Sequence, residues 1–135
     1  NADQMGEFQW TYQLNSTPDN SLAYATRFGW ETRIPFLTRV LPGTGKSVPL
    51  AQPASFLQIK PENLLLVNMA PVEGERAVLL QLREIAGKKA VWGVSSSASK
   101  VAFKSTVCDL LGKALSDGDE IVFEPLESKF IKLTW

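Results

Sequence analysis

The residues that come closest to a known chemical motif are GTGKS at 43–47, which match the end of a phosphate-binding P-loop. A P-loop also requires a glycine five residues before Gly45, and this chain has Val40 there. It further requires a helix after the lysine, but Pro49 restricts Val48 to extended geometry. We therefore interpret residues 43–47 as a flexible glycine loop and not as a nucleotide site.

Acidic side chains are the next candidates, because paired carboxylates can act in a glycosidase or hold calcium. They gather at Asp117, Asp119, Glu120, Glu124 and Glu127. Residues 117–119 read Asp-Gly-Asp, however, and these residue types are favoured in hairpin turns for their backbone geometry. A solvated turn is the favoured interpretation, and the same holds for the Glu-Gly-Glu at 73–75.

The four tryptophans raise the possibility of stacking on a sugar, since aromatic rings present apolar faces to pyranoses. Burial is the commoner role for each of them, and Trp10 alternates with Phe8 and Tyr12 on the expected inward face of a strand. We expect no catalytic residue and no metal ligand in the chain. The candidate ligand-binding residues are Trp30, Trp92, Lys46 and Lys88.

Composition excludes several function classes. The chain has 135 residues and no histidine, which rules out imidazole-based triads and zinc sites with histidine ligands. The 14 Lys and Arg balance the 14 Asp and Glu, and this argues against a nucleic-acid or anionic-membrane partner. Cys108 has no partner for an internal disulfide, and we expect a small apolar residue near a strand end. No apolar run is long enough to span a membrane.

The elements that must position these residues are mostly strands. Alternation at 7–14 predicts a half-buried strand, and residues 22–41 favour extended structure before a proline-rich loop at 41–53. No stretch shows sustained helical periodicity, and residues 108–115 are compatible with at most a single helical turn. Seven short apolar runs separated by turn signals follow the loop, at 56–59, 64–69, 77–82, 90–94, 101–107, 120–123 and 128–133.

About eight strands with turns between them predict an all-β fold, an antiparallel β-sandwich in a single domain. We interpret residues 1–2 as a remnant of tag removal and residues 3–135 as the domain.

The strand motifs together resemble the C-terminal β-domain of glycoside hydrolase family 38, the α-mannosidases. The family has a strand reading P-E-N-hydrophobic, then L-R-L-Y-E-x-x-G, then D-L-L-E-R-P-L, and a closing pair built around P-F-E-I-x-T-L. The residues that match are Pro61, Glu62, Asn63, Leu82, Glu84, Gly87, Asp109, Leu110, Leu111, Leu115, Pro125 and Glu127. FGWETRIPF at 28–36 fits the family more loosely. The chain departs from the pattern at Gln81, Arg83 and residues 112–114.

The resemblance implies a parent enzyme that cleaves terminal α-mannosidic bonds with an aspartate nucleophile and a zinc ion in a separate catalytic domain. No cofactor is expected in this chain, and its partner would be that catalytic domain, with carbohydrate as a further ligand to consider. The loop at 41–53 and the turn at 86–89, which carry Lys46, Lys88 and Lys89, are the candidates to reach the rim of the active site.

Two alternatives stay open: an autonomous carbohydrate-binding module that uses exposed tryptophans, and an immunoglobulin-like structural spacer. The sequence is compatible with either a periplasmic or a cytoplasmic location.

Overall fold

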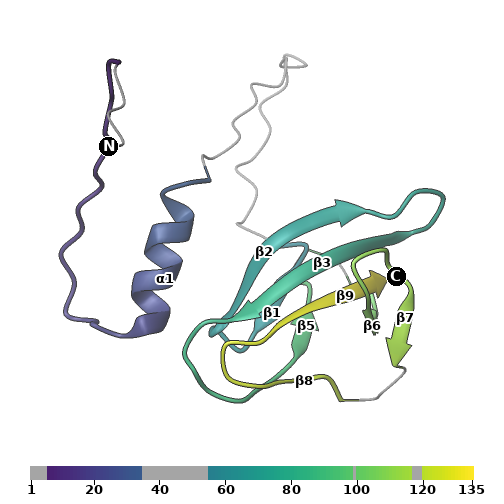
Figure 1. Cartoon of the computed structure of the whole chain (residues 1–135). Coiled ribbons are helices and arrows are strands. Elements are labelled where there is room, and N and C mark those ends of the chain that lie inside the picture. Colours follow the sequence, from purple (N-terminus) through teal and green to yellow (C-terminus); the bar gives the residue numbers. More distant parts are fainter. Residues whose placement is uncertain (1–5, 35–54, 99, 117–119) are drawn as a thin grey trace, which may run out of the picture.

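The structure is a computed structural model that describes residues 6–34, 55–98, 100–116 and 120–135. These residues form one helix and nine strands, and every strand pairing is antiparallel (Figure 1). The elements are α1 (Leu22–Glu31), β1 (Gln58–Lys60), β2 (Leu64–Pro71), β3 (Ala77–Glu84), β4 (Ala90–Val91), β5 (Gly93–Ser95), β6 (Lys104–Cys108), β7 (Ala114–Ser116), β8 (Val122–Phe123) and β9 (Ser128–Thr134). The prediction of an all-β domain is confirmed.

The main sheet has five strands in the order β2-β3-β9-β6-β7. β9 lies at its centre and pairs with β3 on one side and β6 on the other. The hairpin between β2 and β3 turns at residues 73–75, where Gly74 has a φ of 75° that side chains other than glycine rarely adopt. The interpretation of residues 73–75 as a turn is therefore confirmed.

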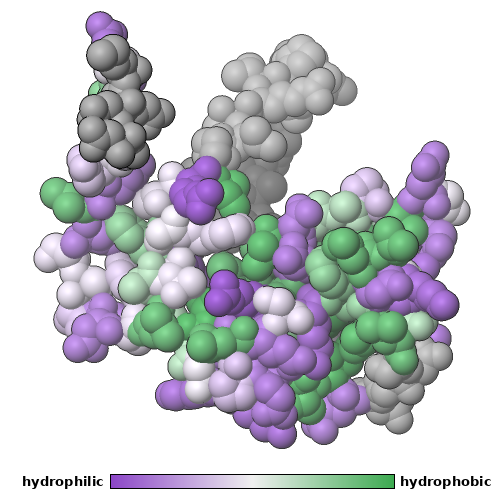
Figure 2. Space-filling model, in the orientation of Figure 1, coloured by the Kyte–Doolittle hydropathy of each residue, from purple (hydrophilic) through white to green (hydrophobic). Residues whose placement is uncertain are grey.

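The core lies on one face of this sheet, as expected for strands in which every second residue is apolar. Leu80 faces Ile131 across β3 and β9, and Leu80, Leu82, Ile131 and Leu133 are fully buried. On the face shown in Figure 2, apolar residues also gather over the sheet at the right of the view. The exposed side chains of Met69 and Leu115 belong to its two edge strands.

Two short ladders complete the core. In the first ladder β4 pairs with β8, and the two strands contribute Ala90 and the fully buried Phe123. In the second ladder β1 pairs with β5, and the two strands contribute Ile59 and Val94. The apolar run at 90–94 thus forms two strands, separated at Trp92. Because the described residues place these ladders in two separate sheets, a two-layer sandwich stays a prediction.

The prediction of extended structure for residues 22–41 is wrong over α1. Ser21 is the N-cap, and its hydroxyl accepts the Tyr24 N–H at 3.1 Å. Tyr24 and Phe28, four residues apart, stack on one side of the helix with ring centroids 6.5 Å apart. None of the helix residues is fully buried, and the described part of the chain contains no helix long and apolar enough to cross a membrane.

Two other local predictions need correction. Residues 7–14 form no strand and are exposed throughout, so Phe8, Trp10 and Tyr12 do not point into this core. Residues 108–115 form a tight turn and then the first part of β7, because Asp109 Oδ1 accepts the N–H groups of Leu111 and Lys113 and so favours a turn over a helix. The prediction for Cys108 is confirmed, since it is a buried free thiol at the end of β6. Residues 1–2, 43–47 and 117–119 lie outside the described residues.

Candidate functional site

The most unusual group in the structure is the carboxylate of Glu84, which is fully buried at the end of β3. It accepts five hydrogen bonds, which saturate both oxygens. Oε1 receives the Asn63 amide at 2.8 Å and the Ala86 N–H at 2.7 Å. Oε2 receives the N–H groups of Gly87 at 2.9 Å, Lys88 at 3.2 Å and Leu126 at 2.8 Å. We call Glu84 with these five donors the Glu84 network.

Local geometry explains why three separate segments converge there. Glu84 continues the buried face of β3 after Leu80 and Leu82, so the pleat carries its side chain inward. Gly87 has a φ of 68°, which folds the following loop back so that its N–H groups face the carboxylate. Leu126 also has a positive φ, 61°, which is rare for a large side chain, and its N–H is held by Glu84.

The hydrogen bonds determine the ionisation of Glu84. Burial by itself disfavours the charged form, but the N–H of Leu126, the amide of Asn63 and the N–H groups of Ala86 and Lys88 outweigh it and lower the pKa of Glu84 to about 2. Nearby, the Lys129 ammonium and then the Glu124 N–H lower the pKa of Glu127. Glu84 is therefore a permanent anion at neutral pH with no oxygen left for acid–base chemistry.

This ionisation predicts how stability depends on pH. Because folding lowers the pKa of Glu84 from 4.5 to about 2, its contribution is complete above the unfolded value and is lost as the pH falls. We expect the free energy of unfolding to fall by on the order of 2 to 3 kcal/mol between about pH 5 and pH 2 from this group alone. Urea unfolding across that range checks it, with Glu84→Gln as the control. An equally steep decline in the variant would contradict the assignment.

The candidate ligand-binding tryptophans lie in different surroundings. Trp92 lies between β4 and β5, packs against the core, and donates its Nε1–H to Ser105 at 2.9 Å. Trp30 lies in the last turn of α1, and its buried Nε1 has no partner within the described residues. The Arg33 guanidinium lies 5.9 Å from the centre of its ring. Trp92 is thus already engaged in packing and hydrogen bonding.

The candidate lysines are divided between described and undescribed parts of the chain. Lys46 and the whole loop at 41–53 lie outside the described residues. The turn at 86–89 is present, and Lys88 has an exposed side chain while its main-chain N–H belongs to the Glu84 network. Its neighbour Lys89 pairs with Glu124 at 2.9 Å. The structure gives Trp30, Trp92 and Lys88 separate sets of partners.

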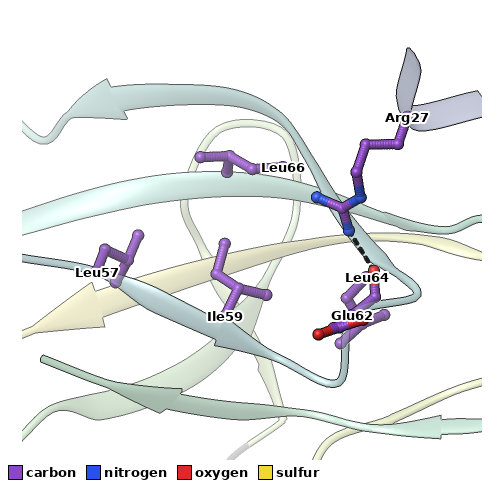
Figure 3. Close-up of a pocket in the computed structure, with 6 residues that line it drawn as sticks. All are labelled: Arg27, Leu57, Ile59, Glu62, Leu64 and Leu66. Atoms are coloured by element: carbon purple, nitrogen blue, oxygen red, sulfur yellow. Dashed lines mark hydrogen bonds between the residues drawn. The ribbon is translucent and has the colours of Figure 1, made fainter. Parts of the chain in front are cut away.

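A pocket of about 500 Å³ opens between α1, β1 and β2 (Figure 3). Its wall is formed by four aliphatic side chains, and the Arg27 guanidinium closes one end by donating to the main-chain oxygen of Glu62. The aliphatic residues are Leu57, Ile59, Leu64 and Leu66. Glu62 also lines the pocket, so the lining presents both polar and apolar surface and does not by itself favour an apolar side chain over a polar ligand.

The zinc ion implied by the family resemblance does not fit this chain. The sequence has no histidine, and the described residues contain no group of three or more Cys, Asp or Glu side chains that could hold a metal. Glu84, the one fully buried carboxylate among the described residues, is saturated by N–H donors that point at it and would repel a cation. We therefore derive no chemistry through zinc here.

Sequence reasoning included Glu84 only as part of a family motif and did not predict its role. The sequence did contain a signal. Glu84 follows Leu80 and Leu82 at alternate positions of β3, so it shares their buried face, and the cost of burying its charge must be offset by hydrogen bonds. Comparison with known proteins adds no further assignment, since no family model, curated protein or solved structure matches the chain.

Proposed function

We propose that this chain is a non-catalytic accessory β-domain of an α-mannosidase-like glycoside hydrolase, and that it packs against and supports the catalytic domain. One observation carries the proposal: residues from three separate motifs of the family resemblance meet around Glu84. Asn63 and Gly87 donate to Glu84, and the main-chain oxygen of Glu127 accepts the Glu84 N–H at 2.9 Å. The direct bond between the Asn63 amide and the Glu84 carboxylate gives residues from two of these motifs a shared structural role.

The arrangement supports a structural role. Glu84 joins the segment before β2, the loop after β3 and the turn between β8 and β9. A carboxylate that is held by five donors and stays ionised to about pH 2 fixes loops and does not transfer protons. The pocket beside Arg27, lined by four aliphatic residues together with Arg27 and Glu62, adds a surface that a neighbouring domain can contact.

The proposal is tested by reconstitution. It requires the reading frame to encode a catalytic domain, which is produced without residues 1–135 and then mixed with the separate 135-residue chain. We expect the chain to bind, to raise the melting temperature of the catalytic portion and to increase hydrolysis of an aryl α-mannoside. Absence of binding at micromolar concentrations, or a reading frame without such a domain, would refute the proposal.

A carbohydrate-binding module is the second candidate, because the Trp10 side chain is 75% exposed and its ring stacks on Phe8. The two functions predict different titrations. For a supporting domain, we expect the tryptophan fluorescence of the isolated chain to stay constant on addition of methyl α-mannoside or mannobiose. A saturable change that disappears in Trp10→Ala would favour the binding module instead, and Trp92→Phe is the control for an indole already bonded to Ser105.

A further inference from the structure

The residues whose environment the fold explains least are 7–14, which we call the aromatic segment. All eight are exposed, and the apolar residues Phe8, Trp10, Tyr12 and Leu14 have exposed fractions of 51, 75, 83 and 96%. Isolated exposed apolar side chains are ordinary, but here four in one short segment expose apolar surface, and the rings of Phe8 and Trp10 stack with centroids 6.4 Å apart. Such a surface is typical of an interaction site.

The spacing within the aromatic segment indicates the shape of the site it fits. In an extended chain successive side chains point to opposite sides, so the four apolar residues share one side. The other side carries Gln9, Thr11 and Gln13. Burying the apolar side also removes water from the main chain, whose N–H and C=O groups then need partners. A sheet edge beside an apolar surface supplies both requirements.

The five-stranded sheet of this chain is a poor acceptor. Figure 1 shows α1 between the aromatic segment and the sheet. The edge strand β2 is interrupted by a register shift between Leu66 and Asn68, by the Asn68 side chain that accepts the Met69 N–H, and by Pro71 at its end. The opposite edge strand, β7, has only three residues. The β1–β5 and β4–β8 ladders also have open edges, but their strands are only two or three residues long. A second copy of the chain would offer these same edges.

We propose that the aromatic segment adds as an edge strand to an antiparallel sheet of the neighbouring domain, with its four apolar side chains buried on that sheet. This inference rests on the proposed function and assigns the contact by which the accessory domain is attached. The Asn15 amide donates to the Tyr24 hydroxyl at 2.5 Å, and Arg27 donates to the main-chain oxygen of Glu62. The added strand is therefore linked through α1 to the start of β2.

Hydrogen exchange of the amides at 8–14 tests the inference in two samples, the intact protein and the 135-residue chain alone. In the isolated chain we expect the rate of an unstructured peptide. In the intact protein we expect exchange slowed by ~100-fold or more at alternate amides, because an edge strand bonds its partner through every second residue. Trp10 should also become inaccessible to acrylamide quenching. Fast exchange of these amides in the intact protein would overturn the inference.

Two substitutions at one position separate backbone pairing from side-chain burial. Thr11→Pro removes a main-chain donor and leaves the four apolar side chains, whereas Thr11→Ser keeps the donor. Where residue 11 belongs to the slowed set of alternate amides, we expect only the proline variant to lose the protection. Where the slowed amides are those of residues 10 and 12, the N–H of residue 11 faces solvent, and Tyr12→Pro compared with Tyr12→Phe replaces this pair. Equal protection in both variants, or protection that appears in the isolated chain as its concentration rises, would overturn the inference. If the chain binds in the reconstitution experiment but the amides of the aromatic segment still exchange rapidly, this inference alone is refuted. If the chain does not bind, the proposed function is refuted.

Discussion

Glu84→Gln is expected to lower the free energy of unfolding by about 3 to 5 kcal/mol at neutral pH. The side chain keeps its shape, but its NH₂ group must face either the Asn63 and Ala86 donors or those of Gly87, Lys88 and Leu126. At least two donors then lose their acceptor, and each such loss costs about 1 to 3 kcal/mol. Urea unfolding followed by tryptophan fluorescence measures the change.

Glu62→Gln is the matched control for this experiment. It removes the same charge in the adjacent segment, but Glu62 is exposed and its contact with Arg27 uses the main-chain oxygen. We expect its effect to stay within about 0.5 kcal/mol. If the two variants were equally stable, the Glu84 network would not hold the three segments together.

Phe123→Ala is the second substitution with a large expected effect, about 3 to 5 kcal/mol of destabilisation. Phe123 is fully buried, faces Ala90 across the β4–β8 ladder and belongs to the main core cluster. Its removal leaves a cavity between the ladder and the five-stranded sheet. Thermal unfolding monitored by circular dichroism provides the measurement.

Val91→Ala is the control for the ladder itself, since Val91 lies in β4 opposite Val122 but is 50% exposed. We expect a loss below about 1 kcal/mol, because much of its side chain already contacts water. Phe123→Leu should recover most of the stability lost in the alanine variant. A loss in Val91→Ala as large as in Phe123→Ala would show that strand pairing, and not core volume, sets the stability of this region.

Most strands from residue 56 onward could be predicted from sequence because each apolar run is bounded by turn residues. Each of the seven predicted runs overlaps a strand in the structure, but β3 extends beyond the run at 77–82, and β7 lies outside all seven runs. Single-sequence patterns do not specify which strands pair, and so the order of the five-stranded sheet and the two separate ladders were not predicted.

The errors before residue 35 have a common physical origin. Apolar residues alternate at 7–14 and also at 22–30, yet α1 forms in the second segment because Ser21 caps it and Tyr24 contacts Phe28. The N-cap hydroxyl and contacts between residues four apart favour a helix. They outweigh the alternation of apolar and polar residues, which favours a strand, when no neighbouring strand is present to pair with it. In the aromatic segment, residues 7–14, the alternation of apolar and polar residues indicates that the chain can pair with a strand. The described residues supply no partner strand for it.

The site was only partly accessible to sequence reasoning. Glu84, Gly87 and Asn63 were included in the family motifs, but the Leu126 donor could not be found, since it lies 42 residues from Glu84 in sequence. Leucine at a φ of 61° also contradicts local preference. Such a position becomes understandable only when its tertiary hydrogen bond is known.

The central place of β9 has a consequence for biosynthesis. β3 and β6 are not neighbours and are joined only through β9, which follows every other strand of the sheet in the sequence. A nascent chain that has emerged as far as β7 therefore has the β2–β3 hairpin and the β6–β7 pair, with Leu80 and Leu82 uncovered. Assembly of the sheet must await residues 128–134, so the growing polypeptide passes through a stage in which its uncovered apolar residues offer a chaperone a surface to bind.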